Sequence, residues 1–145
     1  MKATDIIERL DRIPKDESDL VAPLYEALDE DVEVDDPRNF FPLAFKYMRE
    51  RDPAEFGAPG PLSHVIEKYF PDYVGDLADS LKIKPTEPTL FLAQRILNSA
   101  RIRKDKDSVE ALPQLVEALL YAKNHLVLER CFIEEIDEMV SQSRC

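Results

Sequence analysis

The sequence predicts an all-α protein of about eight helices in antiparallel pairs, stacked as a HEAT-like α-solenoid. Apolar residues recur with a period near 3.6 along almost the whole chain, and almost never with a period of 2. Prolines stand where helices are expected to begin, and there the missing N–H costs no helical hydrogen bond. The connections between the apolar stripes are short, which favours helices that pack against their neighbours. The 145 residues, positions 1–145, are expected to form a single helical domain.

The first half of the chain is expected to form three helices and one long loop. One helix is capped by Thr4 and stopped by Pro14, one runs from near Asp19 to Leu28, and one is capped by Asn39 and ends before Pro53. Pro42 falls in the first turn of the third helix, where a proline is tolerated. Residues 52–60 hold two of the three glycines and two prolines, which predicts a loop.

Five further helices are expected in the second half. They run from Pro61 to about Phe70, from Pro71 to about Leu81, from about Pro88 to Asn98 or Ser99, from Leu112 to about Lys123, and from about Leu126 to Val140. The helix at Leu112 has two alternative starts, because Pro113 is either a first-turn residue or a kink after a short turn from Ser108. Residues 101–106 are the one clear basic stretch of the chain.

The charge of the chain favours a protein that binds basic partners. There are 30 acidic and 19 basic side chains, so the net charge is −11. Such a surface repels nucleic acid and anionic membranes, and it attracts a basic protein. Residues 26–36 contain seven acidic residues and no basic one, and a second acidic cluster occupies residues 134–138. An acidic run is also typical of a solvated face that only keeps a protein soluble, and this alternative stays open.

We predict that the partner is a protein and that the acidic run contacts it. The candidate partner-binding residues are Asp29, Glu30, Asp31, Glu33, Asp35 and Asp36, with Glu67, Tyr73 and Asp76 as a weaker group. Tyr73 and Tyr47 are expected to reach the surface, because an amphipathic ring beside carboxylates is typical of an interface hot spot. Neither nucleic acid nor a membrane is expected as a partner.

The chain holds few of the residues that catalysis requires. His64 and Glu67 lie one helical turn apart, but no third residue has metal-binding spacing and the only other histidine is His125. Ser63 lacks a Gly-x-Ser-x-Gly setting, and three glycines cannot form a phosphate-binding loop. We therefore expect no catalytic residue, no metal and no cofactor, and we do not expect an enzyme.

A soluble, cytoplasmic protein is expected. The start, MKATDIIERLDR, is amphipathic and lacks the apolar core of a signal peptide, and no apolar run approaches the ~18 residues that span a bilayer. The two cysteines, Cys131 and Cys145, form neither a secreted disulfide framework nor a metal-binding pattern, which favours a reducing compartment. A disulfide between them stays an open alternative.

A polar cluster is expected between the helix at Pro61 and the helix that ends near Asn98. His64 and Glu67 flank the buried stripe of the first, and Arg95 lies on the second at a position from which it can reach Glu67. Because a buried charge must be paired, we predict a partly buried Glu67–Arg95 ion pair with His64 hydrogen-bonded nearby. Asn98 is expected to end its helix at a left-handed turn.

The middle of the chain resembles a known family. Three segments carry the resemblance: Leu62-Ser-His-Val-Ile-Glu-Lys-Tyr, Asp72-Tyr-Val and Leu92-Ala-Gln-Arg-Ile-Leu-Asn-Ser. In their order and spacing they resemble the helical immunity proteins of bacterial polymorphic-toxin and contact-dependent inhibition systems, in particular the immunity protein 30 family. The matching positions are His64, Glu67, Tyr73, Val74 and 95–98.

This resemblance implies a small cytoplasmic protein that binds one cognate toxin domain and blocks it. Many such toxins are nucleases, which carry positive charge to hold nucleic acid, so an acidic inhibitor can compete with the substrate. The charge and the resemblance therefore point to the same function. The alternative is a helical adaptor in a larger cytoplasmic complex, without a toxin.

Overall fold

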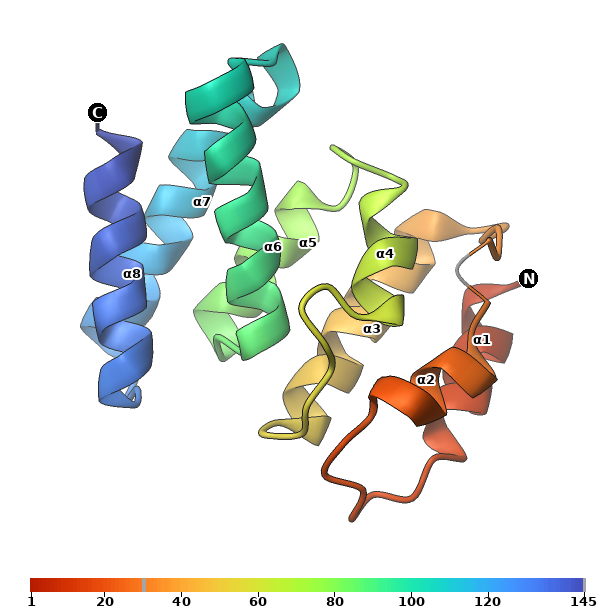
Figure 1. Cartoon of the computed structure of the whole chain (residues 1–145). Helices are drawn as coiled ribbons and strands as arrows, with labels where there is room; N and C mark the ends of the chain where they lie inside the picture. The colour runs from red at the N-terminus through yellow and green to blue at the C-terminus, as the bar shows by residue number, and fades with distance from the viewer. Residues whose placement is uncertain (30, 145) are drawn as a thin grey trace.

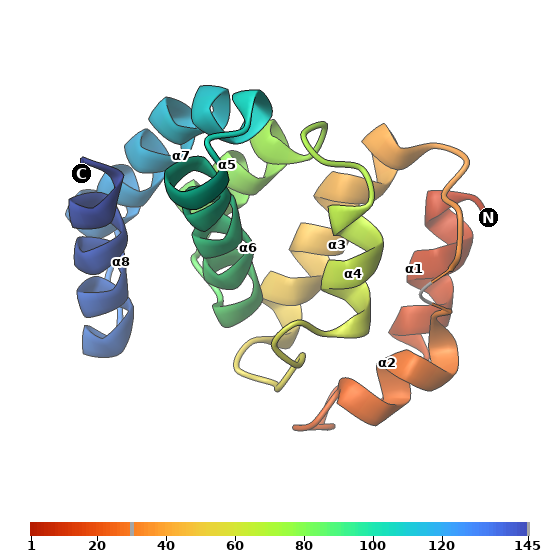
Figure 2. The same cartoon turned by 45° about the horizontal axis from the view of Figure 1, so that its top comes forward.

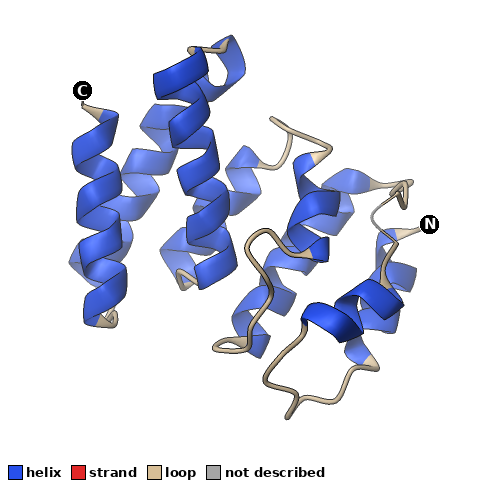
Figure 3. Ribbon diagram, viewed as in Figure 1, coloured by secondary structure: helices blue, strands red, loops and turns tan. Residues whose placement is uncertain are grey.

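The computed structural model describes residues 1–29 and 31–144. This part of the chain is all-helical and contains no strand, as Figures 1 and 3 show, so the predicted class is confirmed. Its helices are α1 (Ala3–Asp11), α2 (Val21–Ala27), α3 (Pro37–Arg51), α4 (Pro61–Glu67), α5 (Val74–Ile83), α6 (Glu87–Asn98), the π-helix η1 (Ser99–Arg103), α7 (Lys106–His125) and α8 (Arg130–Ser143). None of these helices is long and apolar enough to cross a membrane.

The helices follow one another from the N-terminus at one end of the molecule to the C-terminus at the other (Figure 1). The odd-numbered helices contact one another in chain order, α1 with α3, α3 with α5 and α5 with α7. Contacts also join α2 to α4 and α6 to α8 (Figure 2). Packing between helices that are two apart in the sequence therefore recurs along the molecule.

The core is built around α3. Its aromatic residues Phe40, Phe41 and Phe45 are fully buried, and α3 contacts α1, α5 and α6. The prediction that Tyr47 and Tyr73 reach the surface is wrong, because their side chains are only 3% and 2% exposed. The Tyr47 hydroxyl donates to the Leu10 carbonyl oxygen at 3.0 Å, so its polar end is satisfied inside the core.

Arg51, the last residue of α3, is also buried. Its guanidinium donates to the carbonyl oxygens of Ile13 at 2.7 Å and Pro14 at 3.0 Å, and its central carbon lies 4.8 Å from the centre of the Tyr47 ring. These carbonyls follow the end of α1, where no helical N–H can reach them. Arg51 therefore ties the end of α3 to the end of α1.

Two predicted helix starts in the first half are wrong. Thr4 lies inside α1, whose N-cap position is Lys2, and α3 begins at Pro37, before Asn39. Asp36 lies at both starts: its carboxylate accepts the Ala3 N–H at 2.7 Å, and its backbone carbonyl accepts the Phe40 N–H at 3.2 Å as the N-cap residue of α3. Pro42 consequently lies inside α3 instead of its first turn, at the loss of one helical hydrogen bond.

Three predicted helix starts in the second half also shift. Pro71 lies in a turn of residues 68–73, so α5 begins at Val74. The start of α7 is earlier than either alternative, at Lys106, because the Asp105 side chain accepts the Ser108 N–H at 3.1 Å and caps the helix there. The last helix, α8, begins at Arg130, later than predicted.

Candidate partner-binding surfaces

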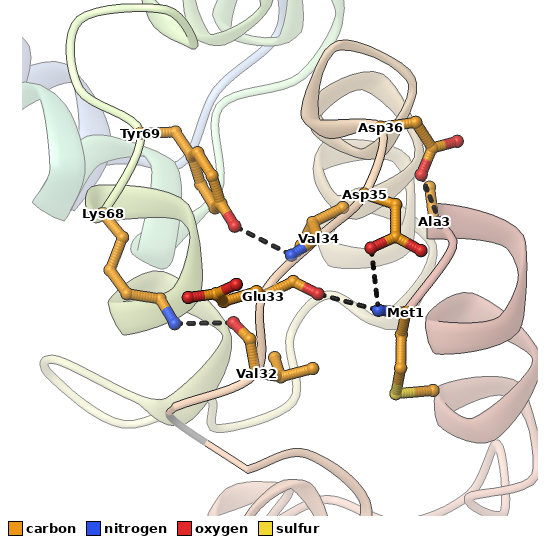
Figure 4. Close-up of polar contacts among 9 residues, drawn as sticks. All are labelled: Met1, Ala3, Val32, Glu33, Val34, Asp35, Asp36, Lys68 and Tyr69. Carbon is orange, nitrogen blue, oxygen red and sulfur yellow. Dashed lines mark hydrogen bonds and ion pairs between the residues drawn. The ribbon is translucent and has the colours of Figure 1, made fainter.

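We use the name acidic segment for residues 29–36, of which Glu30 lies outside the described residues, as does Cys145. Figure 4 shows the contacts that hold this segment on the protein. The N-terminal amine of Met1 donates to the Glu33 carbonyl oxygen at 2.8 Å. On the other side, the Val34 N–H donates to the Tyr69 hydroxyl at 2.8 Å and the Lys68 ammonium donates to the Val32 carbonyl oxygen at 2.6 Å. The acidic segment is therefore fixed between α1 and the turn that follows α4.

Side chains of the acidic segment alternate between the core and the solvent. Val34 is buried at 6% exposure, whereas Asp31, Glu33 and Asp35 are exposed. Residues 32–35 follow the pattern of an extended chain, in which every second side chain points to the same side, and Asp31 lies in the turn before them. The segment thus presents a row of carboxylates from a fixed backbone.

The predicted carboxylates of this segment play different roles. Asp35 lies 3.4 Å from the Met1 amine, Asp36 accepts the Ala3 N–H at the start of α1, and Asp29 accepts the Asp31 N–H at 3.0 Å. Among the described residues, the carboxylates of Asp31 and Glu33 have no hydrogen bond or ion pair. Asp31 and Glu33 are therefore the members best placed to meet a partner.

The environment of Asp36 predicts a dependence of stability on pH. Hydrogen bonds from the Ala3 N–H and the Asn39 side chain lower the pKa of Asp36 from its ordinary value of 3.8. A lowered pKa stabilises the fold above the unfolded-state value, and this contribution is lost as the pH falls through the folded-state value. We expect Asp36→Asn to lower the melting temperature at pH 7, and we expect the difference from wild type to shrink below pH 3.8.

Thermal unfolding followed by circular dichroism at several pH values measures this difference. Asp16→Asn is the matched control, because Asp16 is exposed in the connection between α1 and α2 and forms no hydrogen bond with another described residue. An Asp36→Asn deficit that persists unchanged at acid pH would contradict the role given to the carboxylate.

A groove borders the acidic segment. It encloses about 500 Å³ and is lined by Arg9, Tyr25, Glu26, Ala27, Leu28, Asp29 and Asp31. A smaller hollow of about 250 Å³ extends to Met1 and Val32, and it shares with the groove Arg9, Ala27, Leu28, Asp29 and Asp31. Three carboxylates and one guanidinium line the groove, so its side-chain charge is negative. A basic side chain of a partner fits this charge.

The three weaker candidates do not join the acidic segment in one exposed patch. Tyr73 is buried, and both Glu67 and Asp76 are only partly exposed. Burial, followed by the nearby Asp79 carboxylate, raises the pKa of Asp76, and Arg38 opposes this shift. Placing Tyr73 on an exposed interface was an error, because its ring packs against those of Phe41, Phe45 and Phe70.

The predicted Glu67–Arg95 ion pair is confirmed. Arg95 Nε lies 2.6 Å from Glu67 Oε2, with side-chain exposures of 48% and 20%. His64 forms no hydrogen bond with either residue in the described part of the chain, so its expected role in the pair is not observed. Asn98 ends α6 as predicted, but the chain continues into η1 and the left-handed residue is Lys104, with φ of 54°.

We expect Arg95→Ala to lower the free energy of unfolding by about 1 kcal/mol, which is about 2–4 °C in melting temperature for a chain of this size. The effect is modest because Arg95 is half exposed, and it arises because Glu67 loses the charged partner that it has in the described part of the chain. Thermal unfolding measures it. Arg101→Ala, which removes an exposed arginine of η1, is the control, and an equal loss in both variants would argue against the ion pair.

Four residues singled out in the sequence line one cavity of about 490 Å³: Glu67, Tyr73, Arg95 and Asn98. This cavity lies between the turn after α4 and the π-helix η1, and Arg103 and Ile102 of η1 complete its wall. Sequence reasoning missed these two residues and also Lys68 and Tyr69, which hold the acidic segment. The basic stretch 101–106 drew attention to Arg103, but no sequence pattern indicated that Arg103 would line a cavity together with Glu67 of α4.

Comparison of the chain with protein-family models, curated proteins and solved structures finds no match. Among the described residues, no three His, Cys, Asp or Glu side chains are placed to hold a metal ion. The candidate surfaces are therefore interpreted from their own geometry and charge.

Proposed function

We propose that this chain is an immunity protein that binds and neutralises a cognate bacterial toxin domain with a basic surface. The observation that carries the proposal is the acidic segment, whose backbone is held on both sides while Asp31 and Glu33 extend into solvent. A fixed backbone loses little conformational freedom when a partner binds, so more of the interaction energy is available for affinity. The resemblance of residues 62–99 to helical immunity proteins supports the same function.

Electrostatics give this protein a direct way to inhibit a nuclease-type toxin. A nuclease binds the phosphate backbone through lysine and arginine side chains. Carboxylates displayed by the acidic segment compete for those side chains, and the net charge of −11 speeds the encounter. The groove beside the segment offers a negatively charged place for one partner side chain. No catalytic step, metal or cofactor is part of this mechanism.

The finer architecture belongs to the same proposal. We infer a HEAT-like stack of antiparallel helix pairs, supported by the contacts between alternate helices. Gln94 of α6 donates to Gln142 of α8 at 3.2 Å, and burial together with Glu87 of α6 raises the pKa of Glu135 of α8. Both pairs are 48 residues apart (142 − 94 and 135 − 87), as expected for helices that run in the same direction. Residual dipolar couplings of α6 and α8 in solution test this arrangement, and axes that diverge strongly would overturn it.

Co-expression tests the function. The chain is expressed with the C-terminal domain of the protein encoded immediately upstream, and host growth and copurification are scored. Rescue of growth together with a stable complex is the expected result for an immunity protein in the cytoplasm. Healthy growth without the chain, or the absence of a complex, would instead favour a helical adaptor.

A further inference from the structure

The cavity of about 490 Å³ between the turn after α4 and η1 has the size of a small-molecule site. It lies on the other side of the 68–73 turn from the acidic segment, because Lys68 and Tyr69 contact that segment while Glu67, Phe70 and Tyr73 line the cavity. One of its walls is a π-helix, an element that is frequent at functional sites. The acidic groove and this cavity are therefore separate features.

Three side chains of the cavity can donate hydrogen bonds to an anion. The Tyr73 side chain is 2% exposed, yet no hydrogen bond joins its hydroxyl to another of the described residues. Burial, and to a lesser degree the Glu67 carboxylate, raises the pKa of Tyr73, while Arg95 opposes the shift. The hydroxyl consequently keeps its proton at neutral pH and stays a donor.

The two arginines of the cavity add further donors. Arg95 uses its Nε–H for Glu67, which leaves the four N–H groups of its terminal nitrogens. Arg103 is exposed and forms no ion pair with another described residue. With Arg95 and Arg103 against Glu67, the cavity carries a formal side-chain charge of +1, on a chain whose net charge is −11. A singly charged anion suits this site better than a dianion, which the rest of the chain repels more strongly.

Apolar side chains form the remaining part of the wall. Phe70, Ile96 and Ile102 line the cavity, and Ile102 is 76% exposed. An apolar group that covers these side chains gains free energy through the area it removes from water. The site thus combines anion donors with an apolar surface.

We propose that this cavity binds a monocarboxylate attached to an apolar or aromatic body. The carboxylate accepts hydrogen bonds from Arg103, Arg95 and the Tyr73 hydroxyl, and the apolar body packs on Phe70 and Ile102. Two sources offer this chemistry: a free organic acid, and the C-terminal residue of a peptide chain. The inference stands apart from the proposed immunity function, because it requires neither a toxin nor the acidic segment.

Titrations of the full chain followed by two-dimensional NMR test the site. The probes are 3-phenylpropionate and acetyl-Ala-Ala-Phe with a free carboxyl group, and each is paired with its uncharged carboxamide. Saturable shifts at Tyr73, Ile102 and Arg103 are expected, with each acid binding about tenfold more tightly than its amide. Tighter binding of the peptide identifies a chain terminus as the source, and tighter binding of phenylpropionate identifies a free acid.

Two variants locate the binding. Arg103→Gln is expected to weaken the binding of both acids about tenfold. Tyr73→Phe, which removes one hydroxyl, is expected to weaken it about fivefold. Arg101→Gln is the matched control, because Arg101 belongs to η1 but does not line the cavity. Unchanged melting temperatures show that the variants fold. Equal binding of acid and amide, equal losses in Arg101→Gln and Arg103→Gln, preference for inorganic phosphate, or no saturable shift would each overturn the proposal.

Discussion

Replacing Glu26, Asp31 and Glu33 with lysine is expected to slow association with a basic partner by about 10- to 100-fold. All three residues are exposed, and Glu26 and Asp31 line the groove beside the acidic segment. Each change adds two charge units, so the net charge moves from −11 to −5 (−11 + 3 × 2). The helical circular dichroism is expected to stay nearly constant, because none of the three carboxylates forms a hydrogen bond or ion pair with another described residue. Stopped-flow binding to the proposed toxin domain measures the association rate.

A charge-matched control separates a local contact from the effect of net charge. Glu129, Glu134 and Glu138 are exposed residues at α8, and lysines there change the charge of the chain equally. If the acidic segment is the contact surface, this second triple variant is slowed only through its net charge, and therefore less than the first. Equal slowing of the two triple variants would assign the effect to long-range electrostatic attraction alone. The difference in rate between wild type and variants would then disappear at high salt. No slowing in either would make the acidic segment a solvated face.

The helical class and the helix interiors could be predicted from the sequence because they depend on local periodicity. Ile6 and Leu10, or Leu62 and Ile66, recur at helical spacing and are buried as that spacing requires. The Glu67–Arg95 pair could also be predicted, since a carboxylate beside a buried stripe needs a partner. These predictions depend only on residues in neighbouring turns of one helix and, for the ion pair, on one adjacent helix.

Helix ends and the cavity depend on residues that are distant in the sequence. Asp36 caps α1 across 33 positions, and Arg51 holds the carbonyl of Ile13 across 38. No local pattern encodes these contacts, so Thr4 and Asn39 were the natural but incorrect caps. Tyr73 was placed at the surface for a related reason: its spacing allows either face, and the aromatic rings of α3 decide the outcome.

The same rings connect the core to both candidate sites. The ring centre of Phe41 lies 6.0 Å from that of Tyr69, which holds the acidic segment through Val34, and 6.1 Å from that of Tyr73, which lines the cavity. A fully buried phenylalanine thus supports one side chain of each surface. Through Phe41, the packing of the core positions the residues proposed to bind ligands.

Phe41→Ala is therefore expected to lower the free energy of unfolding by about 3–5 kcal/mol, a large part of the ~5–15 kcal/mol that stabilises a typical domain. The loss combines the apolar area of a fully buried ring with the cavity left behind it and two aromatic contacts. Chemical denaturation followed by circular dichroism measures the change. NMR resonances of Tyr69, Tyr73 and Val34 are expected to shift in the same variant.

Phe40→Ala is the matched control, because Phe40 is equally buried on α3 but its ring is not paired with Tyr69 or Tyr73 in the described part of the chain. Its stability loss is expected to be similar, since both rings leave a cavity of similar size. Phe40→Ala is expected to shift the NMR resonances of Tyr69 and Tyr73 less than Phe41→Ala does. Under conditions where the variant is folded, it is expected to bind carboxylate ligands and the partner protein with affinities closer to those of the wild type. If both variants perturb Tyr69 and Tyr73 equally, the link between the core and the two surfaces runs through α3 as a whole and not through the Phe41 ring.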